Sequence, residues 1–141
     1  MLIRSSLREA IRDPYIQINL IFAGVVVAML IYSGIFTGQG GHPIPSFYEM
    51  ITGTTSPSSG LSRAFSELVR FNVVKARALN SHAVSLFLFF VVELLLRIVF
   101  SAVVCVKHNH EKIIVSLDIV QLVLYFSIAF FPFFAFFLHQ F

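Results

Sequence analysis

Apolar residues gather in three long segments of this chain, and polar stretches separate them. The segments run from about residue 18 to 36, from 84 to 106 and from 113 to 138. A helix needs roughly 20 apolar residues to cross the hydrocarbon core of a bilayer. Because lipid offers the backbone no hydrogen-bond partner, segments this apolar must be helical. The pattern predicts an all-α integral membrane protein with three transmembrane helices.

The second and third segments are separated only by residues 107–112, so they are expected to form an antiparallel helical hairpin. A cleaved signal peptide is the alternative for the first segment. Its apolar run exceeds the roughly 7–15 residues of a signal peptide's apolar region. No convincing cleavage site follows it, and we expect an uncleaved helix.

The polar stretches carry shorter helical patterns. Residues 1–14 are predicted to form an amphipathic juxtamembrane helix, which Pro14 ends or bends into the first span. In the loop of residues 37–83, apolar residues at helical spacing predict a helix over 61–69. Asn72 is a suitable N-cap for a second helix over 73–79, and Asn80 or Ser81 can cap the second span. These two helices are expected to lie at the membrane interface, and the chain forms one membrane domain, residues 1–141.

Composition agrees with this class. Of the 141 residues, 57% are hydrophobic and 12% are charged, whereas soluble domains have about 25% charged residues. The pI near 9.4 is explained by basic residues beside anionic lipid headgroups, and no nucleic-acid partner is expected.

The basic residues also predict an orientation. Arg4, Arg8 and Arg12 precede the first span, and Lys107 and Lys112 flank the second turn. Basic residues next to the first helix usually remain in the cytoplasm. We expect a protein of the bacterial inner membrane with a cytoplasmic N-terminus and the 37–83 loop on the outer face. The single cysteine, Cys105, then lies at the inner end of the second span and has no intrachain disulfide partner.

The loop contains a compact motif, Ser56-Pro57-Ser58-Ser59-Gly60-Leu61-Ser62-Arg63-Ala64. From residue 47 to 97 the chain resembles the bacterial membrane family labelled domain of unknown function 2752. The signature of that family is Cys-Pro-x-Cys-Gly-x-Thr/Ser-Arg, followed by a short helix, a His-Gly-Asp-like turn, a second helix and Asn-Pro before a span. Pro57, Gly60, Ser62, Arg63 and Ala64 match the signature, and Asn80 matches its asparagine. Ala76 fits the second helix, and Asn72 stands where the turn aspartate would be.

The chain also departs from that signature. Ser56 and Ser59 replace the two cysteines, Arg70 and Phe71 replace the His-Gly, and Ser81 replaces the proline. The resemblance implies a fold and a membrane location and supplies no activity. A cysteine pair at positions 56 and 59 would suit thiol-redox or metal chemistry, which serine does not support.

With serines, the motif has three interpretations. Ser58 or Ser59 is expected to cap the helix that begins near Leu61. The alternative is that Ser56, Ser59, Gly60, Ser62 and Arg63 hold an anion or a partner at the helix N-terminus. A serine nucleophile needs a nearby base, and His42 or His82 is the available candidate, although no recognisable motif places either.

Polar residues inside the spans form a second candidate site. Glu93 and Arg97 are four residues apart and share one helix face. The hairpin brings Gln121 to nearly the depth of Arg97, whose side chain can also reach Asp118, and Asn19 lies at a similar depth. A charge at the bilayer centre costs at least roughly 2.5–3.5 kcal/mol. We therefore expect an intramembrane polar network that either fixes helix register or forms part of a proton, ion or substrate path.

A metal site is a weaker hypothesis. His108 and His110 share a short turn, but a closed zinc site needs four well-placed ligands, so we expect neither a metal nor a cofactor. The chain has no recognisable catalytic set. The sequence favours a non-enzymatic membrane component that binds lipid, another membrane protein or a second copy of itself. One alternative is a thiol-redox or metal-handling membrane protein, if positions 56 and 59 are natively cysteine. The other is a small oligomeric transporter or channel.

Overall fold

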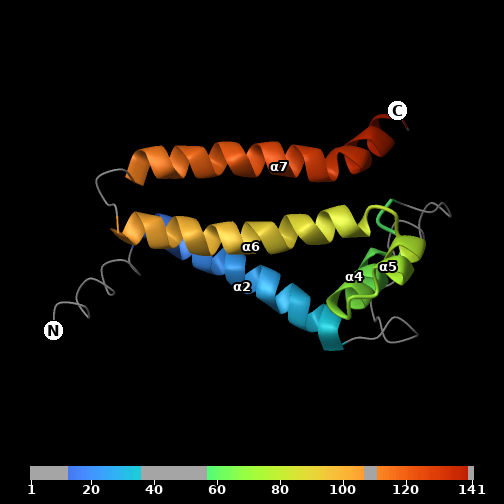
Figure 1. Cartoon of the computed structure of the whole chain (residues 1–141). Coiled ribbons are helices and arrows are strands. Elements are labelled where there is room, and N and C mark those ends of the chain that lie inside the picture. The colour runs from blue at the N-terminus through green and yellow to red at the C-terminus, as the bar shows by residue number, and fades with distance from the viewer. Residues whose placement is uncertain (1–12, 36–56, 107–110, 140–141) are drawn as a thin grey trace.

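Within the part that it describes, residues 13–35, 57–106 and 111–139, the computed structural model of the chain is helical and contains no strand. The described helices are α2 (Pro14–Ile35), α4 (Leu61–Val69), α5 (Val73–Leu79), α6 (Ala83–Val106) and α7 (Glu111–His139), shown in Figure 1. The expected fold class is confirmed. The predicted juxtamembrane helix falls outside the described residues, except for its last two positions.

Three of these helices are long and apolar enough to cross a membrane, namely α2, α6 and most of α7. Their bounds lie within a few residues of the predicted spans. The largest difference is the start of α2, at Pro14 rather than near Ile18. Proline is tolerated at the first helical position because its missing N–H would have no partner there. The Asp13 carboxylate accepts hydrogen bonds from the backbone N–H of Tyr15 at 2.8 Å and of Ile16 at 3.4 Å, which caps the helix one turn early.

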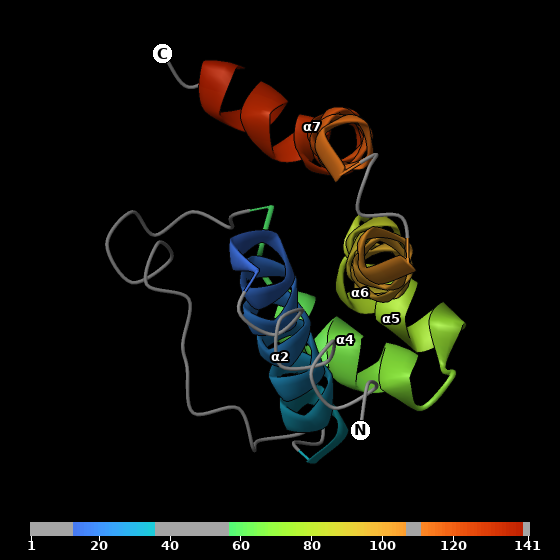
Figure 2. The same ribbon diagram turned by 90° about the vertical axis from the view of Figure 1, so that its left-hand side faces the viewer.

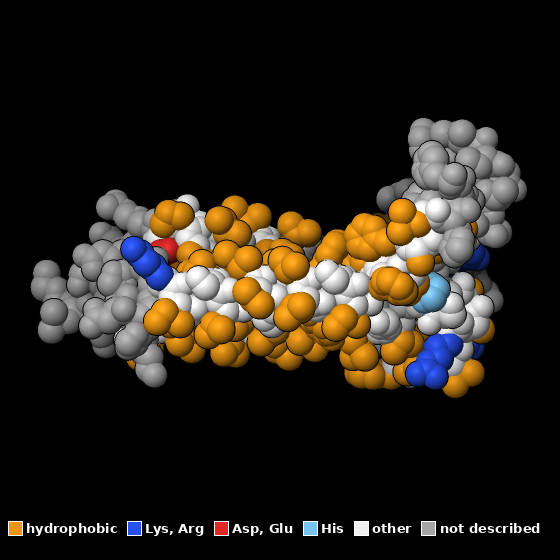
Figure 3. All heavy atoms as spheres, turned by 90° about the horizontal axis from the view of Figure 1, so that it is seen from above, with side chains coloured by type: hydrophobic (Ala, Val, Ile, Leu, Met, Phe, Trp, Pro, Cys, Tyr) orange, Lys and Arg blue, Asp and Glu red, His pale blue; other side chains and the backbone are white. Residues whose placement is uncertain are grey.

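The helix α6 is the centre of the arrangement. It packs against α2 on one side and antiparallel to α7 on the other, and Figure 2 shows α7 standing apart from α2. At one end of the assembly, α2 begins and α6 connects to α7. We call this the hairpin end. The opposite end, at which α2 ends, α6 begins and α4 and α5 lie, is the loop end. Apolar side chains cover the face shown in Figure 3 along most of its length, as expected for helices surrounded by acyl chains.

The loop end contains the larger apolar core. The rings of Phe87 and Phe90 from α6 meet the ring of Phe65 from α4 edge-on, with centroids 5.5 and 6.2 Å away. Edge-to-face aromatic pairs add about 0.5–1.5 kcal/mol beyond the area that they bury. The buried core residues here are Ala64, Phe65, Leu68, Ala76, Ala83, Leu86, Phe89 and Ala129. This core fixes α4 and α5 against the start of α6.

Two sequence features differ in their structural consequences. Figure 1 shows α7 changing direction towards its C-terminal end, where Pro132 lies inside the helix. Proline removes one backbone hydrogen bond and its ring collides with the preceding turn, which accounts for the bend. By contrast, Gly24 and Ala28 in α2 are exposed, and a Cβ placed on Gly24 would meet nothing within 4 Å. This small-residue pair makes no close helix contact within the described chain.

Candidate functional site

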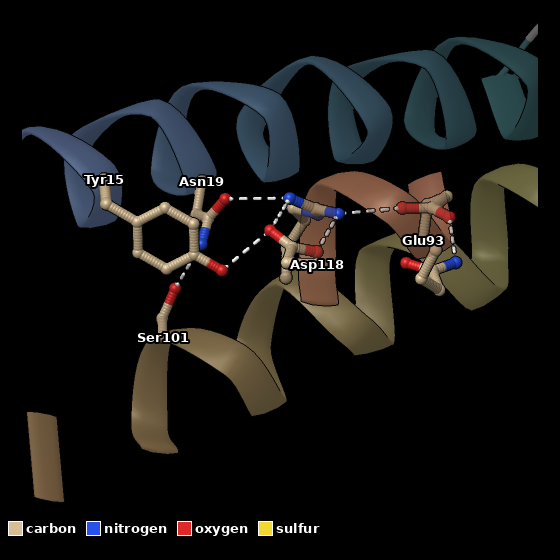
Figure 4. A network of polar contacts seen from close by, with 7 residues as sticks. Tyr15, Asn19, Glu93, Ser101 and Asp118 are labelled. Carbon is tan, nitrogen blue, oxygen red and sulfur yellow. Dashed lines mark hydrogen bonds and ion pairs between the residues drawn. The ribbon is translucent and has the colours of Figure 1, made fainter. Parts of the chain in front are cut away.

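A cluster of charged and polar side chains lies inside the three-helix assembly (Figure 4). Glu93 and Arg97 come from α6, Asp118 from α7 and Asn19 from α2. Their exposed fractions are 0% for Glu93, 6% for Arg97, 1% for Asp118 and 2% for Asn19. Buried charges are stable only when they are paired and hydrogen-bonded. The contacts within the cluster provide that pairing.

The Arg97 guanidinium is the hub of this cluster. Its Nη1 donates to Asp118 Oδ2 at 2.5 Å and its Nη2 donates to Asp118 Oδ1, so the pair is bidentate. The same Nη2 donates to Glu93 Oε2 at 3.1 Å, and Nη1 also donates to Asn19 Oδ1 at 3.2 Å. The guanidinium carbon lies 5.7 Å from the centre of the Phe22 ring, within cation–π range. One cation therefore joins all three spans.

Neutral side chains extend the cluster in both directions. Gln121 Nε2 donates to Glu93 Oε1 at 2.7 Å. At the other side, the Tyr15 hydroxyl donates to Asp118 Oδ2 at 2.7 Å, and Asn19 Nδ2 donates to Ser101 Oγ at 3.0 Å. All five residues that the sequence analysis assigned to an intramembrane network lie in this cluster.

Sequence reasoning missed Tyr15 and Ser101, although spacing marks both. Tyr15 precedes Asn19 by four residues and Ser101 follows Arg97 by four, so each shares the helix face of a residue already selected. Gln121 was expected at nearly the depth of Arg97, and its side chain bonds Glu93, which lies four residues before Arg97 on α6. The Arg97 side chain reaches Asp118, as expected.

The serine motif forms a tight turn at the loop end, and Asn80 holds it. Asn80 Nδ2 donates to the backbone carbonyl oxygens of Pro57 at 2.7 Å and Ser59 at 2.9 Å. Asn80 Oδ1 accepts from the backbone N–H of His82 at 2.9 Å, in the turn that leads into α6. Asn80 or Ser81 was expected to cap the second span. The Asn80 side chain bonds the N–H of His82, one residue before α6 begins, and so ties the motif to the start of that span.

Gly60 has a backbone that only glycine adopts easily. Its φ is +72°, and a Cβ placed there would stand 2.6 Å from the carbonyl oxygen of Leu79 and 3.8 Å from Arg63 Nη2. Glycine is required both for the left-handed conformation and for this close approach. The motif therefore brings the start of α4 against the end of α5.

The expected serine cap is wrong. The N-cap of α4 is Gly60, which has no side chain to cap the helix. The Ser58 carbonyl oxygen accepts from the N–H of Leu61 at 3.1 Å, which closes a turn over residues 58–61. Asn72 is the N-cap of α5 as expected, yet its side chain donates to Glu67 Oε2 at 2.9 Å and caps nothing.

Exposed basic residues surround this motif. Arg63 on α4 and Lys75 and Arg77 on α5 are all exposed, and no ion pair joins any of them to another described residue. Beside them, Phe71 is 90% exposed and Val74 is 83% exposed. Figure 3 shows basic and apolar side chains next to one another at this end. Ser62 is also exposed, whereas Ser56 lies outside the described residues.

The remaining candidates gain no support as reactive groups. His42, His108 and His110 fall outside the described residues. His82 is half-buried, with its ring 5.9 Å from that of Phe133. Among the described residues no group of three histidine, cysteine, aspartate or glutamate side chains is placed to hold a metal ion. Cys105 is exposed near the end of α6.

Comparisons with protein-family models, with curated proteins and with solved structures find no match for this chain. The fold and the site nevertheless define a class of protein. The protein is a multi-pass, all-α membrane protein with three apolar helices, a buried ionic cluster and a pair of short helices at one end.

Proposed function

We propose that this is a non-enzymatic component of the bacterial inner membrane that binds anionic lipid headgroups on the outer face through α4 and α5. We also propose that it belongs to the domain of unknown function 2752 family. The observation that carries the lipid-binding proposal is the set of exposed basic residues beside exposed apolar side chains at the loop end.

The position of α4 and α5 supports binding at the headgroup layer. Arg70, just after α4, donates through Nη2 to the carbonyl oxygen of Gly34 at 2.8 Å, in the last turn of α2. Asn80 similarly ties the motif to the start of α6. The two short helices are thus held where two spans end, and for spans of this length that is the level of the headgroups.

The chemistry of the exposed residues supports an anionic ligand. Between residues 61 and 79 the chain carries three exposed basic residues, Arg63, Lys75 and Arg77, and the half-buried Arg70, against the single acid Glu67. Each basic residue near an anionic membrane surface contributes about 1 kcal/mol of attraction. Phe71 and Val74 supply the apolar contact with the acyl boundary that interfacial helices use.

The family proposal has support from the motif. Two parts of the family-like pattern, Pro57 to Arg63 and Asn80, are separate in the sequence, and the asparagine side chain bonds the turn directly. Gly60 has a conformational reason to be glycine. These contacts give a physical reason for the residues to occur together.

Lipid binding is tested by the thermal unfolding midpoint of the detergent-purified protein with added phosphatidylglycerol or phosphatidylcholine. We expect phosphatidylglycerol to raise the midpoint more. The triple variant Arg63→Gln, Lys75→Gln, Arg77→Gln should lose this difference. Lys112→Gln is the matched control, because Lys112 is exposed at the opposite end of the molecule, and it should retain the difference.

Equal stabilisation by the two lipids, or a triple variant that responds as the wild type does, would contradict the proposal. A response lost in Lys112→Gln and kept in the triple variant would place headgroup binding at the hairpin end instead.

A further inference from the structure

Among the described residues, the buried cluster carries one more negative than positive charge when all its ionisable members are charged. Glu93 and Asp118 face a single guanidinium, that of Arg97, and all three side chains are almost completely buried. The other members that contact them are neutral: Gln121 from α7, and Tyr15 and Asn19 from α2. A net charge in a medium of low dielectric constant is unfavourable, so the cluster favours taking up one positive charge.

We propose that the cluster is a proton-binding site and that Glu93 carries the proton at neutral pH. This inference is independent of the lipid-binding function. A metal ion would need free oxygen ligands, and each oxygen of both carboxylates already accepts a hydrogen bond. A proton needs only one carboxylate oxygen and an acceptor opposite it.

Unequal hydrogen bonding assigns the proton to Glu93 rather than Asp118. Asp118 accepts three hydrogen bonds, two from Arg97 in bidentate geometry and one from the Tyr15 hydroxyl. Glu93 accepts one from Arg97 at 3.1 Å and one from Gln121. Hydrogen bonds to a charged carboxylate favour its charged form, so the charge remains on Asp118.

The contact between Glu93 and Gln121 suits both protonation states. A carboxylate Oε1 accepts from the Gln121 amide N–H at 2.7 Å. If Oε1 is protonated, the amide turns over and its oxygen accepts from the carboxylic acid, because the two ends of an amide have nearly the same shape. In the present orientation Gln121 Oε1 is buried and has no hydrogen-bond partner. The glutamine therefore provides an acceptor for the acid.

Infrared spectroscopy tests this site, because a protonated carboxylic acid has a carbonyl band that a carboxylate lacks. The full chain is purified at pH 7 in dodecyl maltoside, a detergent without carbonyl groups, and the band is identified by its shift in deuterium oxide. We expect the wild type to show one such acid and Glu93→Gln to lose it. Glu67→Gln, which removes a carboxylate far from the cluster, should keep it.

Asp118→Asn provides a second test that keeps Glu93 in place. This variant leaves one carboxylate against one guanidinium, so the cluster is neutral without a proton and the acid band should disappear. A wild type without the band at pH 7, a band that persists in Glu93→Gln, or a band that persists in a folded Asp118→Asn variant would overturn the proposal. If Asp118→Asn does not fold, the wild type and Glu93→Gln decide.

Discussion

At the scale of single residues, Arg97 is important because, among the described residues, it is the one cation that pairs with the buried acids Glu93 and Asp118. Replacing it with leucine leaves Glu93 and Asp118 buried without their common partner. Losing one partner of a buried ion pair costs about 3–5 kcal/mol. We expect Arg97→Leu to lower the free energy of unfolding by this amount, measured by titration with sodium dodecyl sulfate in mixed micelles.

The matched control for that variant removes the acids as well. A triple variant, Arg97→Leu with Glu93→Gln and Asp118→Asn, leaves no unpaired charge and should regain much of the lost stability. If the triple variant is no more stable than Arg97→Leu alone, the cost arises from lost packing and not from uncompensated charge.

Two glycines of the described chain differ sharply in what they tolerate. Gly60→Ala should destabilise the protein by at least about 1–2 kcal/mol, the cost of a left-handed backbone for an alanine, because the new methyl group also meets the Leu79 carbonyl. Gly24→Ala meets nothing and should stabilise α2 by about 0.5–1 kcal/mol. Detergent unfolding of both variants checks the pair, and equal effects would contradict this explanation.

The sequence supports residue-level inference unevenly. Glu93, Arg97 and Asp118 stand out because charges are rare in apolar segments. Tyr15 and Ser101 do not, because a hydroxyl in such a segment carries no comparable signal. The serine cap was wrong because serine favours helix N-caps in general, while the glycine that occupies the position is fixed by a contact with Leu79 in another helix. Such a contact cannot be predicted from the sequence, because it depends on how α4 packs against α5.

At the scale of elements, helix positions were predictable from apolar runs and from the asparagines that precede them. The bounds of α4 and α5, Leu61–Val69 and Val73–Leu79, agree with the prediction. Their attachment to the spans was not predictable, since it depends on Arg70 and Asn80 reaching backbone carbonyls that are distant in sequence.

Asn80 joins two elements through two separable kinds of contact. Asn80→Asp keeps the acceptor for the His82 N–H and loses the donor to Pro57 and Ser59, whereas Asn80→Ala loses both. An unsatisfied polar group costs about 1–3 kcal/mol. We expect faster backbone hydrogen exchange in residues 57–61 for both variants, and in the first turn of α6 for Asn80→Ala only.

The same exchange profile in the two variants would contradict this separation. Ser81→Ala is the matched control, because Ser81 is exposed beside Asn80 and its loss should leave both segments unchanged.

At the scale of the whole molecule, the orientation in the membrane that the basic residues predict is open to direct measurement. In a Cys105→Ser background, Ala78→Cys places a thiol at the loop end and Lys112→Cys places one at the hairpin end, both at exposed positions. With the N-terminus in the cytoplasm, a membrane-impermeant maleimide should label Ala78→Cys in spheroplasts. It should label Lys112→Cys only after the membrane is opened, and the reverse result would invert the topology.

The bidentate contact between α6 and α7 has a consequence for how the chain is synthesised. Glu93 has its partner Arg97 one turn away on the same helix, α6. Asp118 lies on α7, and its guanidinium partner is on α6. When α7 leaves the ribosome, it reaches the translocon with an unpaired carboxylate unless α6 is still beside it. We expect α7 alone to insert poorly into microsomes and the α6–α7 pair to insert together, with glycosylation reporters as the readout. In that case α6 and α7 insert into the membrane together as one helical hairpin.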